Sequence, residues 1–245
     1  MIRQLIFLAG SMIIGVAHAE TPPPMVTVTA LAAVQAMGKS LASNAMSFHE
    51  HTIREYTDAN GQPLHIVHDG DVLARRPDRL AVQINGDDGA TTLDYDGKSL
   101  TIYRPNTNKY ISVPVTGDLE QMFRTVSERL DVDFPLADLL AAAPEKAFMS
   151  GITTGYELDP VTINSVEARH FLFTQPPGIE LELWTEKTDR ALPLRLIVTY
   201  RSLPGEPRFI AELSNWKLDP TLADSEFVFT PPAGATEIKR EEKSP

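Results

Sequence analysis

The sequence predicts an α+β fold: one large, curved antiparallel sheet of roughly ten or more strands, with helices packed on its concave face. Much of the 245-residue chain falls into short runs in which apolar and polar side chains alternate, as in a half-buried strand. Tight-turn sequences such as Asn60-Gly61 separate neighbouring runs, which favours hairpins. Parallel pairing would need crossover helices, and the sequence lacks them.

Both ends of the chain are predicted to lie outside this fold. An apolar run from Leu5 to Val16 follows Arg3 and precedes Ala17-His18-Ala19, the pattern of a secretory signal that is cleaved after a small residue. The run is shorter than the roughly 20 residues that a membrane-spanning helix needs. We therefore predict a signal peptide at 1–19, a flexible Pro-rich linker at 20–30, a single domain at 31–235 and a disordered polar tail at 236–245.

Within the domain, the periodicity of apolar residues predicts the elements in order. Apolar residues at helical spacing predict a helix from Leu31 to Ala45. Alternating patterns then predict strands at 47–57, 64–69, 79–85, 91–95, 99–103 and 109–113. Two short helices are expected at 118–130 and 135–149, with Asp118 and Pro135 at their starts, where the dipole favours an acid and where proline is tolerated. Strands resume at 156–166, 168–175, 179–186, 193–200, 208–218 and 226–232.

The segment 179–200 shows most clearly that the sheet has two different faces. Side chains of alternate residues project to opposite faces of a strand. On this rule the apolar face carries Ile179, Leu181, Leu183, Leu194, Leu196, Val198 and Tyr200, while Glu180, Glu182, Trp184, Arg195, Ile197 and Thr199 lie on the other. Helices laid on the apolar face are the simplest way to cover it.

Composition excludes several classes of partner and compartment. The formal net charge is −11 and Lys and Arg form no block that could contact phosphates, so we expect no nucleic acid partner. The chain has no cysteine, which excludes disulfides and the lipidated cysteine of a bacterial lipoprotein. With a cleaved signal and no later apolar span, we expect a soluble periplasmic protein that is not an integral membrane protein.

The sequence offers little support for catalysis or metal binding. It contains no Gly-x-Ser-x-Gly elbow, Gly-rich phosphate loop or His-Glu-x-x-His motif, so we expect neither an enzyme nor a cofactor. Four histidines, at positions 49, 51, 65 and 68, surround one predicted hairpin, and the first two share a face that would suit two zinc ligands. Surface histidines that respond weakly to pH are the favoured interpretation, so we predict no metal site.

Several short motifs follow one another along most of the domain. They are Asp96-Gly97-x-x-Leu100-x-Ile102-Tyr103, Pro135-Leu136-Ala137-Asp138-Leu139-Leu140, Leu192-Pro193-x-Arg195-x-x-x-Thr199-Tyr200, Phe209-x-Ala211-x-Leu213-x-x-Trp216 and Phe227-x-Phe229-x-Pro231-Pro232. In combination they resemble an uncharacterised family of predicted periplasmic proteins in the LolA/LolB lipoprotein-carrier-like superfamily. The resemblance implies a LolA-like open half-barrel that helices close.

The resemblance also implies an apolar cavity, because relatives of known role share a cavity for acyl chains. The expected function is a binding or carrier module for a lipid, an acyl chain or a lipidated protein, with helices 119–130 and 136–143 as lid or plug. The cavity candidates are Met122, Phe123 and Leu139 from the lid and Phe171, Phe173, Leu181, Leu183, Leu196 and Val198 from the sheet. Arg76 is the head-group candidate, because it belongs to an Arg-Pro element that lies near the cavity mouth in the carriers. The arginine that closes the carriers' lid has no equivalent identified in the sequence.

Two alternatives stay open at this point. The same alternation is equally typical of a filled core with no cavity. A ligand-free protein-interaction or envelope-stress regulatory module would instead use the outer sheet face, with an envelope protein as partner; Trp184 and Trp216 fall on the polar phase of their strands. An exposed apolar patch around Trp184 would favour the interaction module, and a continuous cavity under the helices would favour the carrier.

Overall fold

The computed structural model describes residues 25–130 and 134–238. The predicted signal peptide and most of the predicted tail lie outside them. The helical elements are α1 (Val28–Leu41), η1 (Pro105–Thr107), α2 (Leu119–Leu130), α3 (Ala137–Leu140), α4 (Pro144–Phe148) and η2 (Asp224–Phe227). The strands are β1 (Ala45–Thr57), β2 (Pro63–Arg75), β3 (Arg79–Gly86), β4 (Thr91–Tyr95), β5 (Ser99–Arg104), β6 (Lys109–Pro114), β7 (Thr154–Ile163), β8 (Val166–Gln175), β9 (Ile179–Glu186), β10 (Pro193–Tyr200), β11 (Arg208–Leu218) and β12 (Thr236–Glu237).

All these strands form one sheet, in the order β12-β6-β5-β4-β3-β2-β1-β11-β10-β9-β8-β7. Two meanders, β1 to β6 and β7 to β11, join where β11 pairs with β1 in the middle of the sheet. Neighbours pair antiparallel except β12, which runs parallel to β6. The predicted fold class, a single large antiparallel sheet with helices on one face, is confirmed.

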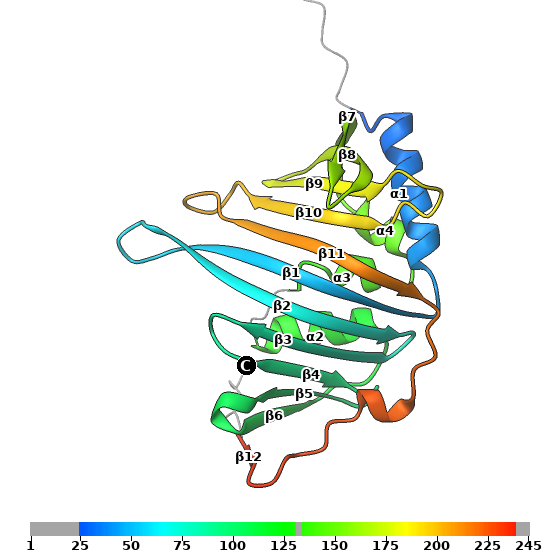
Figure 1. The fold of residues 1–245 in the computed structure, drawn as a ribbon. Coiled ribbons are helices and arrows are strands. Elements are labelled where there is room, and N and C mark those ends of the chain that lie inside the picture. The colour runs from blue at the N-terminus through cyan, green and yellow to red at the C-terminus, as the bar shows by residue number, and fades with distance from the viewer. Residues whose placement is uncertain (1–24, 131–133, 239–245) are drawn as a thin grey trace, which may run out of the picture.

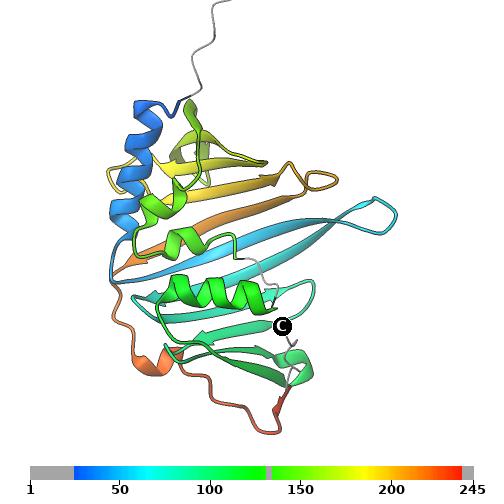
Figure 2. The same ribbon diagram turned by 180° about the vertical axis from the view of Figure 1, so that it is seen from behind.

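The helices that link the two meanders lie across one face of the sheet. Figure 1 shows the sheet in front of α2, α3 and α4, and Figure 2 shows the same helices from the concave side. Because the connection from β6 to β7 must cross the width of the sheet, the chain places its apolar helices over the apolar face as it returns. α1 packs beside them at the β7 end.

The apolar stripes of the helices are buried as their spacing predicts. In α1, Val34, Met37 and Leu41 are fully buried, and Thr27 caps the helix by accepting a hydrogen bond from the Ala30 N–H at 3.3 Å. In α2 the buried residues are Leu119, Met122, Phe123 and Val126. These side chains meet the concave faces of the strands in one continuous hydrophobic core.

The predicted strand at 226–232 is wrong. This segment begins within the end of η2 and then runs irregularly along the outer face of the sheet, so its Phe-x-Phe alternation does not reflect strand pairing. The boundaries of the domain also differ from those expected from composition. The helix begins at Val28, within the predicted linker, and Thr236–Glu237 form β12, within the predicted tail.

Leu194 also departs from the simple alternation. The register shifts between Pro193 and Arg195, because β10 has a bulge there with one extra residue that has no partner on β9. Leu194 consequently packs with Ile197 against the outer-face cluster of Trp184 and does not join the concave core.

Glu50 is a carboxyl group on the concave face, at the centre of the sheet. It lies on β1 opposite Leu213 on one side and Gly70 on the other, and it is only 9 % exposed. Gly70 leaves room for it, since a Cβ there would lie 3.2 Å from Glu50 Oε1. Burial raises the pKa of Glu50 to about 7, against a smaller opposing effect of His68 and His49.

We predict that Glu50→Gln stabilises the protein in a pH-dependent way. As pH rises from about 4.5 to 7 the unfolded carboxyl ionises before the native one, so the wild type loses stability over this window and carries the full penalty above it. The variant should gain about 1 to 3 kcal/mol at pH 8 and little at pH 4. Urea unfolding at both pH values measures this; Glu128→Gln on the exposed face of α2 is the control, and an equal gain at both pH values would contradict the assignment.

Candidate ligand-binding cavity

A cavity of about 210 Å³ lies between the concave face of the sheet and the lid segment, defined here as residues 134–149. Its lid side is formed by Phe134, Pro135, Asp138, Leu139 and Phe148, and its sheet side by Gln175, Ile179, Leu181, Leu196, Val198 and Tyr200. The sheet residues come from the ends of β8, β9 and β10 that adjoin the β8–β9 and β10–β11 turns. The lining is mostly apolar, with a few polar groups, as is usual for small-molecule sites.

Register explains why the sheet side of the cavity is so uniform. Leu181 pairs with Val198 across β9 and β10, and Leu183 pairs with Leu196. Directly paired residues of antiparallel strands project to the same face, so two rows of aliphatic side chains point at the lid. Four of the predicted cavity residues therefore line the cavity: Leu139, Leu181, Leu196 and Val198.

The other five predicted residues do not line the cavity and lie in the packed core around it. Met122, Phe171 and Leu183 are fully buried. The Phe123 ring packs on that of Phe134 with 5.0 Å between centroids, and the Phe173 ring meets that of Phe148 edge-on at 5.4 Å. The alternation thus corresponds to a filled core at some positions and to a cavity lining at others, since packed core surrounds a smaller cavity.

Several lining residues were not among the predicted candidates. Ile179 and Tyr200 share the apolar phase of their strands with Leu181 and Val198, so extending the same alternation to the strand ends would have found them. Phe134 and Phe148 carry no such signal. Phe134 precedes α3 and Phe148 ends α4, and the position of these short helices on the sheet depends on tertiary packing.

The structure places Arg76 away from this cavity, at the opposite end of the strands. Arg76 follows β2, next to the start of β1, whereas Tyr200 ends β10 near the start of β11. Its guanidinium donates to the Ala141 carbonyl in the lid segment through Nε at 3.0 Å and Nη2 at 2.7 Å, and through Nη1 to the Ser43 carbonyl. Arg76 therefore ties the lid segment to the α1–β1 turn, a contact that the sequence did not identify.

A second contact holds the next residue of the lid segment. Glu120 on α2 accepts a hydrogen bond from the Ala142 N–H at 2.9 Å. Adjacent backbone groups, the carbonyl of 141 and the amide of 142, are thus held from two directions. Burial lowers the pKa of the Arg76 guanidinium and the Glu120 charge opposes that effect, while burial and the same Glu120 charge raise the pKa of Asp138.

The outer face around Trp184 is covered. Trp184 is 7 % exposed, its ring stacks on that of His170 with centroids 4.0 Å apart, and the Arg195 guanidinium lies 5.5 Å from the ring centroid. The predicted polar phase of Trp216 is wrong, because the register of β1 and β11 shifts beside it and its ring packs against the main core. It stacks on Phe48 at 4.3 Å and donates from Nε1 to the Pro193 carbonyl at 2.9 Å. Both indoles serve packing, so neither contributes to an exposed apolar patch.

The histidines around the β1–β2 hairpin contact nearby acidic side chains. His49 contacts Asp71 at 3.0 Å and Asp69 at 3.3 Å, and His68 contacts Asp88 at 2.7 Å. Hydrogen bonding to Asp71 is the main cause that raises the pKa of His49. Within residues 25–130 and 134–238, no group of His and acidic side chains has an arrangement that could hold a metal.

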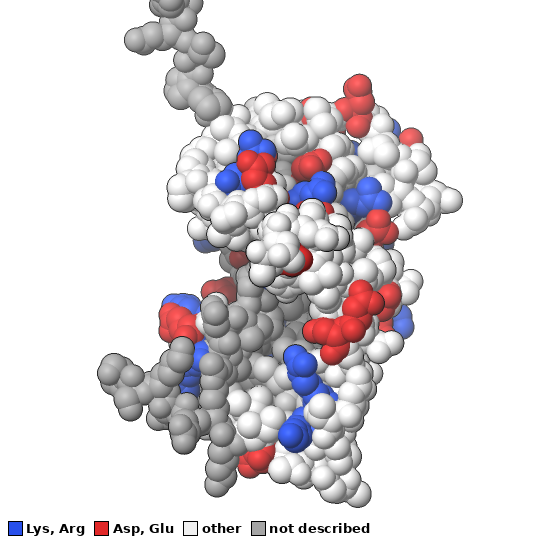
Figure 3. Space-filling model, turned by 90° about the vertical axis from the view of Figure 1, so that its left-hand side faces the viewer, with Lys and Arg blue, Asp and Glu red and all other residues white. Residues whose placement is uncertain are grey.

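Charged groups of both signs are interspersed at the end of the molecule from which this hairpin projects. Figure 3 shows acidic and basic side chains there in small separate groups. Glu55 on β1 contacts His65 across the hairpin at 3.3 Å and Arg208 on β11 at 2.8 Å. No helix in the described part of the chain is both long and apolar enough to cross a membrane.

Comparison with known proteins defines the class of this chain. A family model described as "Predicted periplasmic protein (DUF2092)" matches residues 30–240. The chain belongs to that family, and its open half-barrel with helices on the concave face is the LolA-like fold that the sequence motifs implied. No curated protein matches the chain.

Solved structures that are similar to this chain are distant from it in sequence. LprF from Mycobacterium bovis is 15% identical with a TM-score of 0.50, and the alignment covers 86% of this chain and 99% of LprF. The lipoprotein LppX from Mycobacterium tuberculosis is 14% identical with a TM-score of 0.48, covering 80% and 99%. An uncharacterised conserved protein from Thermus thermophilus is 13% identical with a TM-score of 0.48, covering 86% and 99%.

We predict that Arg76→Met loosens the lid segment specifically. The change removes the hydrogen bonds to Ala141 and Ser43, and bonds from a charged donor are worth about 1.5 to 3 kcal/mol each. Counting one such bond to each of the two carbonyls, the variant should lose roughly 3 to 6 kcal/mol of stability, and amide hydrogen exchange should rise most in residues 137–148. Arg124→Met, on the exposed face of α2, is the control. A uniform rise in exchange, or none, would show that Arg76 does not hold the lid.

Proposed function

We propose that this protein is a non-enzymatic periplasmic module that binds a lipid, an acyl chain or a lipidated protein between its sheet and its lid segment. The cavity under the helices carries the proposal, because apolar side chains of β9 and β10 and of α3 face each other across unfilled space. The resemblance to lipoprotein carriers and the family's description as periplasmic support it. Asp138, the acidic residue of the lining, would lie near a polar head group rather than the chain.

The size of the cavity implies that the lid segment moves when cargo enters. At about 210 Å³ the cavity is smaller than the roughly 300 to 1,000 Å³ typical of small-molecule sites. The lid segment contains only a four-residue and a five-residue helix, and helices this short have little stability of their own. An acyl chain would therefore enter at this cavity and widen it by displacing α3.

The energies of lid displacement and of chain burial are of similar size. Leu136, Leu139 and Leu140 are buried, and exposing each costs roughly 1.5 to 3 kcal/mol, so that moving α3 costs on the order of 5 to 9 kcal/mol. Burying an acyl chain contributes about 0.8 kcal/mol per methylene, on the order of 10 kcal/mol for an ordinary chain. An acyl chain can therefore offset lid opening, whereas a short apolar ligand cannot.

A ligand-free interaction module receives less support. An exposed apolar patch around Trp184 would favour that hypothesis, and Trp184 is covered by His170 and Arg195. The exposed apolar residues of β7 and β8 lie at the edge of the sheet instead; they are Tyr156, Leu158, Val161 and Val166. Protein contacts at this edge are compatible with cargo binding and do not replace it.

The deciding experiment is native mass spectrometry with lipid extraction, on protein purified from periplasm without detergent. We expect a reproducible bound acyl species. Leu196→Trp should abolish it, because the larger side chain occupies the cavity from the floor, at a stability cost of about 1 to 3 kcal/mol.

Thr199→Phe is the matched control, because it adds an aromatic ring on the same strand but on the opposite face. This variant should keep the ligand. A wild type that carries no ligand and takes up no added fatty acid or lipopeptide would refute the carrier function. Partner capture through the β7 edge would then be the next experiment.

A further inference from the structure

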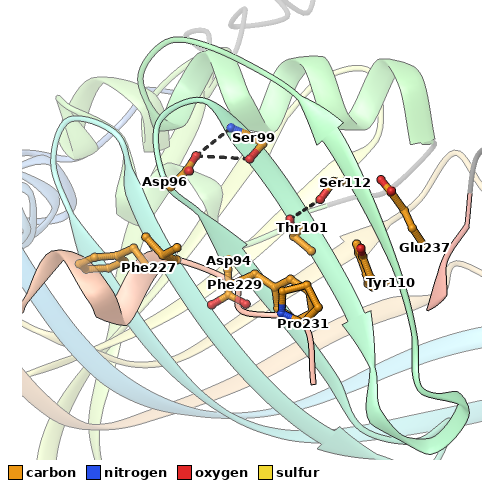
Figure 4. A pocket seen from close by; sticks show the side chains of 11 residues that line it. Asp94, Asp96, Ser99, Thr101, Tyr110, Ser112, Phe227, Phe229, Pro231 and Glu237 are labelled. Carbon is orange, nitrogen blue, oxygen red and sulfur yellow. Dashed lines mark hydrogen bonds between the residues drawn. The ribbon is translucent and has the colours of Figure 1, made fainter. Parts of the chain in front are cut away.

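A second pocket, of about 250 Å³, lies on the opposite, convex face of the sheet. It is bounded by the outer surface of β4, β5 and β6 and by the C-terminal strap, defined here as residues 219–238 (Figure 4). Asp94 pairs with Thr101, and Thr101 pairs with Ser112, so these side chains form one row across three strands. The pocket is separated from the proposed lipid cavity by the sheet itself.

The strap that forms the outer wall of this pocket is anchored at both ends. At one end Arg75 donates to the Leu222 carbonyl at 2.8 Å and pairs with Asp224. At the other end Thr236 N–H donates to the Asn108 carbonyl at 3.0 Å, and Asn108 Nδ2 donates to the Ala233 carbonyl at 3.2 Å. Because backbone and side-chain contacts hold both ends, the wall is in place before any ligand arrives.

Aromatic rings form one side of the pocket. Phe229, from the strap, packs against Tyr110 with ring centroids 5.1 Å apart and against Tyr103 at 5.4 Å. Tyr110 and Phe229 both line the pocket. The negative faces of aromatic rings attract cations that come within about 6 Å of the ring centre.

Asp94 is the most unusual group in the lining. It is half-buried, and no hydrogen bond or ion pair joins its carboxylate to any residue within the described ranges. Burial alone raises its pKa to about 6. Asp96 differs, since it accepts backbone hydrogen bonds from Lys98 and Ser99 at 2.9 Å and is satisfied within its own turn.

The neighbouring polar groups cannot neutralise Asp94. The hydroxyls of Thr101 and Ser112 bond to each other at 2.6 Å, and Glu237 adds a further carboxylate. The lining residues include no Lys, Arg or His. A carboxylate that is partly desolvated without a counter-charge is costly, and a ligand cation would offset that cost.

We propose that this convex pocket binds a compact organic cation, an ammonium or guanidinium group, held between the Asp94 carboxylate and the rings of Phe229 and Tyr110. The group could be carried by a free amine or by a Lys or Arg side chain of a polypeptide, since both present the same chemistry. The pocket would accept such a cation whether or not the concave cavity binds lipid.

The test is a titration of the isotope-labelled full chain, followed by amide NMR at pH 7.5. Butylguanidinium and butylammonium represent free cations, capped Gly-Arg-Gly represents a polypeptide side chain, and butylurea is the neutral isostere. We expect saturable shifts in β4, β5, β6 and the strap with the cations and none with butylurea. A preference for the peptide or for the free cation identifies the source, and either preference supports the proposal.

Three variants distinguish cation binding in this pocket from nonspecific attraction of cations to an acidic protein. Asp94→Asn should weaken cation binding at least tenfold, and Phe229→Leu should weaken it several-fold while leaving the carboxylates in place. Asp159→Asn, an exposed acid on β7, should bind as the wild type does. Absence of saturable shifts, equal binding of butylurea, or unchanged binding in Asp94→Asn would overturn the proposal.

Discussion

The structure depends on one constraint: a twelve-stranded sheet with an apolar concave face must cover that face without closing into a barrel. Strands β1 to β6 and β7 to β11 meander to either side of the β1–β11 pair, so the edges of the sheet stay far apart. The chain between the two meanders crosses the concave side, and it carries the helices that cover it. Burial of apolar area thus determines where the helices lie, and an unfilled space remains only where the lid segment faces the ends of β9 and β10.

Packing and polar contacts have different roles in closing that space. Leu119, Met122 and Val126 fix α2 in the core, whereas the lid segment contains backbone groups that Arg76 and Glu120 hold from outside. Hydrogen bonds exchange readily with water and contribute modest net stability, while a well-packed core resists any change in volume. Under the proposed function, this difference would let the cover open at α3 while α2 stays packed in the half-barrel.

The two faces of the sheet provide pockets of opposite chemistry. On the concave side, aliphatic pairs such as Leu181 and Val198 face the lid segment. On the convex side, Asp94, Thr101 and Ser112 project toward a strap that excludes part of the solvent. The alternation of side chains along each strand produces an apolar and a polar face, and the segments that cover each face determine where a pocket remains. Near Trp184 the same outer face is filled by His170 and Arg195.

The sequence by itself determined the fold class, the meandering order of consecutive strands, the apolar face of β9 and, beyond the bulge at Leu194, the apolar face of β10, because these follow from local periodicity and turn chemistry. It also identified Leu139 on the lid side of the cavity and Leu181, Leu196 and Val198 on its sheet side. Only the tertiary structure decided where empty space remains, since a filled core and a cavity have the same alternation. The position of Arg76 beside Ala141 and of Phe229 over the outer sheet likewise depends on contacts between residues far apart in the chain, which no local pattern encodes.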